Sequence, residues 1–288
     1  MLIKHLLLLL FSFCSFYLFS QQISSLGNVD IIDSYYNPSF TAFENEQRYS
    51  SLCRQLQPRS GVLTEDWREL VVIAETDIDK LNSGLGITLH HEDRFLARTR
   101  SAELNYRYSV VLGDHSNIAL GIGGGYKDYE LDTSGLIFPG GIPENLSQGL
   151  QSGVNLNTGV GLTWNDKLYV GASVMQLNNT RLGIFQLERH YTLHGQYMFD
   201  LTEKFKLQPQ ALWLFNKDLN MLRVNVKGYH NNRFWWMLST GHNIQFMASA
   251  GIRLFGNFDI GYGIDLFRHK YTKTFIGVLH EVFLSYRI

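Results

Sequence analysis

The feature that most constrains this chain is an alternation, with a period of two, between large apolar side chains and small or polar ones. From Phe258 to Leu266 every second residue is large and apolar, and glycine or aspartate stands between them. The same alternation recurs over residues 102–112, 168–174 and 246–254. Because successive side chains of a β-strand point to opposite faces, each run predicts a strand with one continuous apolar face.

The runs are longer than the strands of most soluble sheets, which have about five or six residues. They approach the length of about 9–11 residues that a tilted strand needs to cross the hydrocarbon core of a bilayer. After residue 20, no stretch contains the roughly 18 consecutive apolar residues that a membrane helix requires. The sequence therefore indicates that any crossing of a membrane by the mature chain is made with strands.

Turn-forming dipeptides separate the runs, among them Gly113-Asp114, Asn165-Asp166, Asn231-Asn232 and Gly256-Asn257. With these turns, the pattern predicts about fourteen strands, an even number like that of single-chain outer-membrane barrels. The predicted strands are 46–57, 68–79, 83–94, 98–113, 116–131, 153–165, 167–178, 188–202, 204–217, 220–231, 233–243, 244–256, 258–271 and 274–288. The predicted fold is all-β, a transmembrane antiparallel β-barrel.

A soluble β-sandwich or lectin-like domain would also alternate, but its exposed face normally carries many Lys, Glu and Thr side chains. Here only 18% of residues are charged and 14% are aromatic. The second face is dominated by Gly, Ser, Asn and isolated charges, and the aromatic residues suit interfacial girdles. These observations favour the membrane barrel. The net charge of −1 argues against nucleic acid as a partner.

The N-terminus has the pattern of an export signal. Lys4 precedes the apolar run Leu6–Phe11, and Ser20 is small enough for the last position before a signal-peptidase cut. An uncleaved membrane anchor is the alternative. The predicted organisation is a signal peptide at 1–20, an N-terminal periplasmic segment at 21–45 and an outer-membrane β-barrel at 46–288. Cleavage would leave Cys53 as the single cysteine, so no internal disulfide is expected.

Candidate sites for metal binding or catalysis are weak. His90 and His91 are adjacent in a predicted strand and would point to opposite faces, while His190 and His194 would lie about 13 Å apart along another. No G-x-S-x-G motif or phosphate-binding loop occurs. We therefore expect no catalytic residues, cofactor or metal. The protein could also be a lipid hydrolase with its catalytic residues at the barrel rim. The alternation of residues along the strands does not test this possibility.

A stronger candidate group consists of the charged residues that alternate with the apolar ones and would therefore point into the barrel. Both signs occur, so the side chains can pair across the interior, where an unpaired charge is costly. Such a network would plug or narrow the lumen; a selective pore is the functional alternative. Glycines within 121–125 would relieve crowding there. The predicted inward charges are Glu103, Arg107, Arg253, Asp259, Asp265, Glu281 and Arg287.

Short motifs resemble a known family. Residues 35–42 (YYNPSFTA) are similar to the segment that opens the PorP/SprF family, and residues 280–286 (HEVFLSY) resemble its closing H-E-x-x-L-x-Y motif. Residues 84–87, 120–126 and 168–173 resemble strands in between. Members are outer-membrane proteins of the type IX secretion system and gliding machinery in Bacteroidota. The residues that match the two terminal motifs are Asn37, Pro38, Phe40, His280, Glu281 and Tyr286.

The chain departs from the family pattern at Ser39, Phe43 and Leu56. The resemblance implies a non-enzymatic component of the cell outer membrane that aids export or surface retention of cargo such as adhesins. Its partners would be the lipid bilayer, proteins of the secretion machinery and an adhesin-like cargo. An outer-membrane porin or uptake channel for small solutes is the competing function.

Two connections and one segment are expected to matter for that role. Rim loops near 132–152 and 178–188 would contact protein partners while the barrel anchors them. The Asn37-Pro38 segment would lie on the periplasmic side, where proline fixes an extended chain that can tuck into the barrel mouth.

Overall fold

The computed structural model describes residues 32–43, 47–58, 67–94, 96–132, 150–182, 185–217, 220–241, 245–268 and 275–288. The predicted signal peptide at 1–20 and most of the 132–152 connection lie outside these residues. None of the helices among the described residues is long and apolar enough to cross a membrane.

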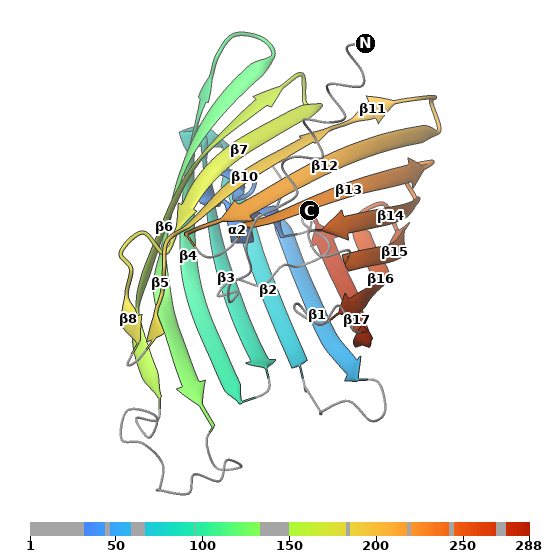
Figure 1. Ribbon diagram of the computed structural model, residues 1–288. Helices are drawn as coiled ribbons and strands as arrows, with labels where there is room; N and C mark the ends of the chain where they lie inside the picture. The colour runs from blue at the N-terminus through green and yellow to red at the C-terminus, as the bar shows by residue number, and fades with distance from the viewer. Residues whose placement is uncertain are drawn as a thin grey trace, which may run out of the picture.

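The architecture is a closed antiparallel β-barrel (Figure 1). Its main sheet has 15 strands, one of which is the two-residue β11 (Phe199–Asp200), so fourteen long strands form the wall. Ladders between β1 and β17 and between β10 and β12 close the ring. The long strands are β1 (Arg48–Pro58), β2 (Trp67–Ile78), β3 (Ser83–Arg94), β4 (Ala97–Val111), β5 (Ser116–Leu131), β6 (Gln151–Trp164), β7 (Leu168–Met175), β10 (His190–Tyr197), β12 (Phe205–Phe215), β13 (Asn220–His230), β14 (Phe234–Gly241), β15 (Gln245–Leu254), β16 (Phe258–Arg268) and β17 (Phe275–Arg287).

These strands confirm the predicted count and the predicted order. Three short elements were not predicted as separate strands: β11, and the small hairpin of β8 (Arg181–Leu182) and β9 (Phe185–Gln186). Two short helices, α2 (Asp33–Tyr36) and η2 (Pro38–Phe40), precede the barrel, and a third, η3 (Asp79–Leu81), joins β2 to β3.

The alternation places its apolar face outward. Leu104 is 67% exposed, whereas Arg107 in the same strand is 3% exposed. Lipid is therefore the medium that covers the apolar face, since contiguous apolar surface of this extent is rare on soluble monomers. The aromatic residues that are exposed with it include Tyr106, Tyr126, Trp164, Tyr191, Trp213, Tyr262 and Tyr286.

The inner face differs from the predicted mixture of small and polar residues. On β1, β2 and β12 it carries large apolar side chains, among them Leu52, Val71, Ile73, Leu212 and Leu214, each at most 1% exposed. With neighbours they form one buried cluster, which we call the lumen cluster. Two residues that precede the wall strands, Ile32 and Tyr36, complete this cluster.

One end of the barrel, the turn end, has very short connections. Both residues of Asn231-Asn232 and of Asn165-Asp166 have positive φ, as tight hairpin turns require. The barrel also begins and ends here, because the amide of Ile288 donates to the carbonyl of Gln47. Short turns face the periplasm in outer-membrane barrels.

Candidate functional site

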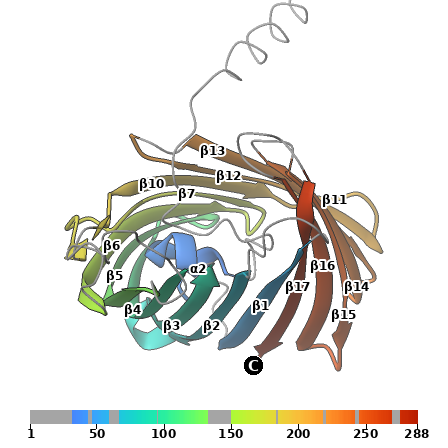
Figure 2. The same cartoon turned by 60° about the horizontal axis from the view of Figure 1, so that its bottom comes forward.

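Residues 32–43 lie inside the ring of strands, where α2 is visible in the view toward the barrel interior (Figure 2). We call this segment the plug. Ile32, Tyr36, Asn37 and Phe40 are each at most 1% exposed. The η2 helix packs against β4, β5 and β6. The motif that resembles the opening of a known family is therefore a buried element of the lumen.

The plug turns sharply at Asn37-Pro38. Asn37 is extended (φ −149°, ψ 110°), as expected before proline, and η2 begins at Pro38. The Asn37 Oδ1 atom accepts hydrogen bonds from the Ser39 amide (3.0 Å) and the Ser39 hydroxyl (2.8 Å), which caps η2. The expected extended chain is therefore wrong from Pro38 onward, because this side-chain cap stabilises a 3₁₀ turn.

Side-chain to backbone hydrogen bonds hold the plug against β6, β7 and β10. The Asn37 Nδ2 group donates to the carbonyl oxygens of Val160 (3.2 Å) and Ala172 (3.4 Å). The Ser173 hydroxyl donates to the Tyr36 carbonyl (2.6 Å), and so does the Thr192 hydroxyl (3.4 Å). The plug thus contacts the wall through hydrogen bonds that are not part of the β-ladders.

Inward glycines let the plug approach the wall closely. A Cβ atom at Gly121 would lie 2.1 Å from the Ser39 nitrogen, and one at Gly159 would lie 2.0 Å from Asn37 Oδ1. Any larger residue would overlap the plug, so these positions need glycine for close backbone approach. The inward glycines that contact the plug, which we call the glycine seat, are Gly84, Gly86, Gly121, Gly159, Gly161 and Gly171.

The other side of the plug faces the lumen cluster, to which Ile32 and Tyr36 belong. Trp235 and Phe283 stack there with ring centroids 5.3 Å apart. Four of the chain's six methionines are in the cluster: Met175, Met221, Met237 and Met247. Tyr35 packs against it, and burial raises the pKa of its phenol well above the ordinary value.

Some of the predicted inward charges pair directly. Arg253 makes a bidentate contact with Asp259, at 2.9 Å for both bonds, and Arg287 approaches the same carboxylate at 3.8 Å. Arg253 and Asp259 are opposite each other in the β15–β16 ladder. Glu103 accepts hydrogen bonds from two amides, those of Asn155 (2.8 Å) and Asn157 (2.7 Å).

Other predicted charges have partners that sequence reasoning missed. Arg107 pairs with Asp77, and Asp265 lies 3.8 Å from Arg223. Glu281 accepts from Arg54 at 2.9 Å. The missed partners stand at inward parity on β1, β2 and β13, so extending the alternation to those strands would have found them.

The ion pairs continue through β1 and β2. Arg54 is 1% exposed and also lies 3.7 Å from Glu69, whose other oxygen is 3.0 Å from His90 Nε2. Near the turn end, Arg48 contacts both Glu75 (2.7 Å) and Asp33 of the plug (2.8 Å). The charged groups therefore extend from the wall to the plug.

One group of described residues, Glu69, His90 and Glu92, has its ligand atoms within 4.8 Å of one another, as a metal site would. Arg54, beside Glu69, and the buried Lys127, which interacts electrostatically with Glu92 and Glu69, supply positive charge to the same region. These cations offset the negative charge of the two carboxylates.

The histidines lie where strand parity places them. His90 points inward and is 5% exposed, whereas His91 lies on the opposite face and pairs with Asp93 at 3.2 Å. His190 contacts the Glu188 carbonyl, and His194 packs edge-on against Phe40 with centroids 5.5 Å apart. Each of these four histidines has a partner in the protein.

The closing motif does not form one site. Glu281 points inward to Arg54, and His280 lies on the outer side between Gln57 (2.9 Å) and the hydroxyl of Tyr262. Tyr286 is exposed on the outer face.

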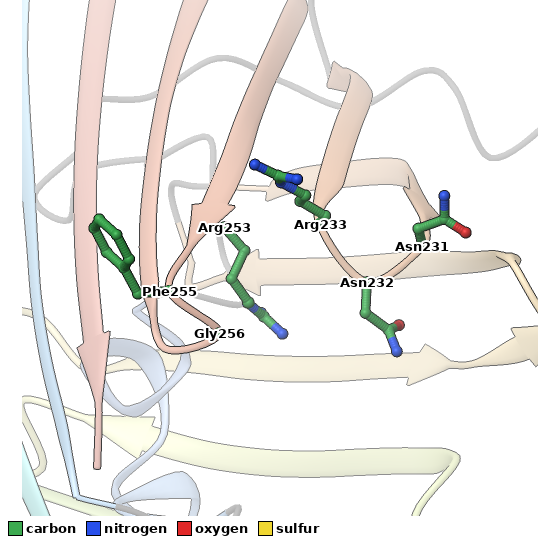
Figure 3. Close-up of a pocket in the computed structure, with 6 residues that line it drawn as sticks. All are labelled: Asn231, Asn232, Arg233, Arg253, Phe255 and Gly256. Atoms are coloured by element: carbon green, nitrogen blue, oxygen red, sulfur yellow. The ribbon is translucent and has the colours of Figure 1, made fainter.

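At the turn end, two neighbouring turns border an open pocket (Figure 3). Its lining includes Arg233, Arg253 and Phe255, and the last of these is 94% exposed. Figure 3 shows the Arg253 side chain directed toward the space between the turns. The guanidinium of Arg253 is already paired with Asp259.

Known structures share this architecture. The toluene transporter TbuX of Ralstonia pickettii superposes with a TM-score of 0.57 at 10% identity, covering 91% of this chain and 94% of its own. The monoaromatic hydrocarbon channel CymD gives a TM-score of 0.58 at 9% identity, with coverages of 92% and 94%. The toluene transporter TodX of Pseudomonas putida gives 0.52 at 11%, with 95% of each chain covered. At these identities the likeness establishes the outer-membrane barrel fold alone.

Sequence comparison gives the family. No curated protein matches the chain significantly. The family model described as type IX secretion system membrane protein PorP/SprF matches residues 28–286, nearly the whole sequence. The chain, a plugged outer-membrane barrel, belongs to the PorP/SprF family of type IX secretion system membrane proteins.

Proposed function

We propose that this protein is a non-enzymatic component of the type IX secretion and gliding machinery that aids export or surface retention of cargo proteins such as adhesins. Family membership supports the secretion role. The observation that carries the proposal further is the filled lumen. The plug contacts the glycine seat on one side and the lumen cluster on the other. A barrel filled in this way is suited to anchoring partners at its ends.

The proposal assigns a task to each end of the barrel. The loops near 132–152 and 178–188 contact the cargo outside the cell. Of the predicted periplasmic segment at 21–45, the part that precedes the plug, 21–31, meets periplasmic components after removal of the signal peptide at 1–20. The described part of the 178–188 loop supports an ordered surface, since the Leu187 amide donates to the Thr180 carbonyl at 2.8 Å.

A porin or uptake channel is the second candidate, because the solved structures with this fold include hydrocarbon channels and toluene transporters. The inner face argues against free passage, since large apolar residues of β1, β2 and β12 are buried inside the barrel. A wide aqueous channel would instead carry a polar inner face.

Deletion of the gene is expected to abolish surface display of the partner adhesin while uptake of small nutrients stays normal. Whole-cell labelling with an antibody to the adhesin measures display, and growth on limiting nutrients measures uptake. Complementation with the intact gene is the control. Normal display in the deletion strain would contradict the secretion role, and a selective nutrient defect would favour the channel.

A further inference from the structure

The plug is bound to the barrel as a ligand is bound to a receptor. The barrel closes without it, through the β1–β17 and β10–β12 ladders. No plug residue is part of the main sheet. Its attachments include hydrogen bonds, the ion pair of Asp33 with Arg48, ring contacts, and packing against the glycine seat and the lumen cluster. The plug can therefore leave without breaking a ladder.

The wall groups that hold the plug keep other partners when it leaves. Arg48 contacts Asp33 of the plug but also makes two hydrogen bonds to Glu75, at 3.0 and 2.7 Å. The hydroxyls of Ser173 and Thr192, which are both within hydrogen-bond distance of the Tyr36 carbonyl, are also within hydrogen-bond distance of each other, so one can donate to the other once the carbonyl is gone. In an empty site, few buried polar groups would therefore lack hydrogen-bond partners, so the free-energy cost of emptying it is reduced. The site is preformed.

The opposite side of the site can adapt to a different occupant. Four methionines belong to the same buried cluster as Ile32 and Tyr36. Methionine has a flexible, polarisable side chain and is typical of surfaces that repack around different apolar partners. The glycine seat fixes the backbone of an occupant, while the methionines tolerate variation in its side chains.

We infer that the barrel lumen is a peptide-binding site and that residues 32–43 are its exchangeable occupant. The ligand class is defined by the plug: an Asn-Pro turn, with the Asn side chain bonded to strand carbonyls and with aromatic side chains before and after the turn, at the positions of Tyr36 and Phe40. A polypeptide segment of a partner with this chemistry replaces the plug. The inference rests on the proposed function only for the origin of that segment.

Hydrogen exchange on the full-length protein in detergent micelles tests whether the plug leaves by itself. The amides of Tyr35, Asn37 and Phe40 are hydrogen-bonded within the plug, so they are protected while it is ordered in its seat. If the plug leaves while the barrel stays folded, these plug amides should exchange at least roughly 100-fold faster than the amides of the β5–β6 ladder. Exchange of both sets at one common rate would overturn the inference.

Peptide competition tests the binding site. A fluorescent peptide of residues 31–43 is added to the wild-type protein and to the full-length variant Asn37→Ala/Phe40→Ala, whose own plug is weakened. The variant is expected to bind at least roughly 10-fold more tightly, because a tethered competitor acts at a high effective concentration. Fluorescence anisotropy measures binding.

Two controls make the competition specific. A peptide with alanine at the positions of Asn37 and Phe40 should not bind, and adding Gly159→Val to the variant should block the seat. Equal binding of both peptides, or no binding by a variant that keeps the gel mobility of a folded barrel, would overturn the inference. If the variant does not fold, the hydrogen-exchange result decides. Both experiments use purified protein, so their failure is distinguishable from failure of the display assay.

Discussion

Gly121→Val is expected to expel the plug from the lumen, whereas Gly124→Val in the same strand leaves it in place. A Cβ atom at Gly121 would lie 2.1 Å from the nitrogen of Ser39 and 2.3 Å from the carbonyl carbon of Pro38, and neither backbone atom can rotate away. At Gly124, which has the outward parity, the nearest contact is a flexible Leu156 methyl group at 3.4 Å. Overpacking typically costs about 1–3 kcal/mol, and two backbone overlaps place Gly121→Val near the upper end.

Thiol labelling measures the position of the plug. Ser34 is 2% exposed, so a Ser34→Cys variant without other cysteines should react slowly with a water-soluble maleimide. Adding Gly121→Val should accelerate labelling at least roughly 10-fold, the factor that corresponds to about 1.4 kcal/mol, and Gly124→Val should not. Slow labelling in the Gly121→Val protein would mean that the glycine seat does not hold the plug.

Arg54→Met is expected to destabilise the folded barrel by about 3–5 kcal/mol, because it leaves buried carboxylates without their cation. Arg54 lies 2.9 Å from Glu281 and 3.7 Å from Glu69, and both carboxylate side chains are at most 1% exposed. The free energy of unfolding, obtained from urea titrations in lipid vesicles, measures the effect. Replacing Glu281 with leucine in the same protein should recover part of the loss.

Lys167→Met is the matched control for this ion pair. Lys167 and Asp200 are also separated by 2.9 Å, but their side chains are 46% and 43% exposed. An exposed pair contributes at most about 1 kcal/mol. If Arg54→Met cost no more than Lys167→Met, water would reach the network and the lumen would not be dry.

The sequence was sufficient to predict the barrel wall. A strand with lipid on one face must keep its apolar residues at every second position, so the alternation marks each crossing. Its consequence is clear at Leu104 and Arg107, which point to opposite faces. Short turns also carry a local signal, as at Asn231-Asn232, where both residues have positive φ.

The contents of the lumen were less predictable. The pair Arg253 and Asp259 could be expected from one hairpin, in which the two residues are opposite each other. The pair Arg54 and Glu281 joins strands from the two ends of the chain, so it depends on how the barrel closes. The alternation along a strand shows that such residues point inward, but it does not show which of them form ion pairs with one another.

The plug was the least predictable feature. The family resemblance singled out Asn37-Pro38, but a local motif does not tell where a segment will dock. The inward apolar residues Leu52 and Val71 contradict the usual polar lumen, and they make sense only when the plug fills the space beside them. A run of inward apolar residues in a barrel strand is the signal that could have indicated a filled interior.

We propose that this barrel is sealed by its own N-terminal segment and does not conduct solutes. Conductance of the purified full-length protein in planar lipid bilayers tests it most directly. We expect insertion without a steady open-pore current at moderate voltage, with at most brief openings when the plug leaves. A stable, long-lived conductance in most insertion events would contradict it and would favour an uptake channel.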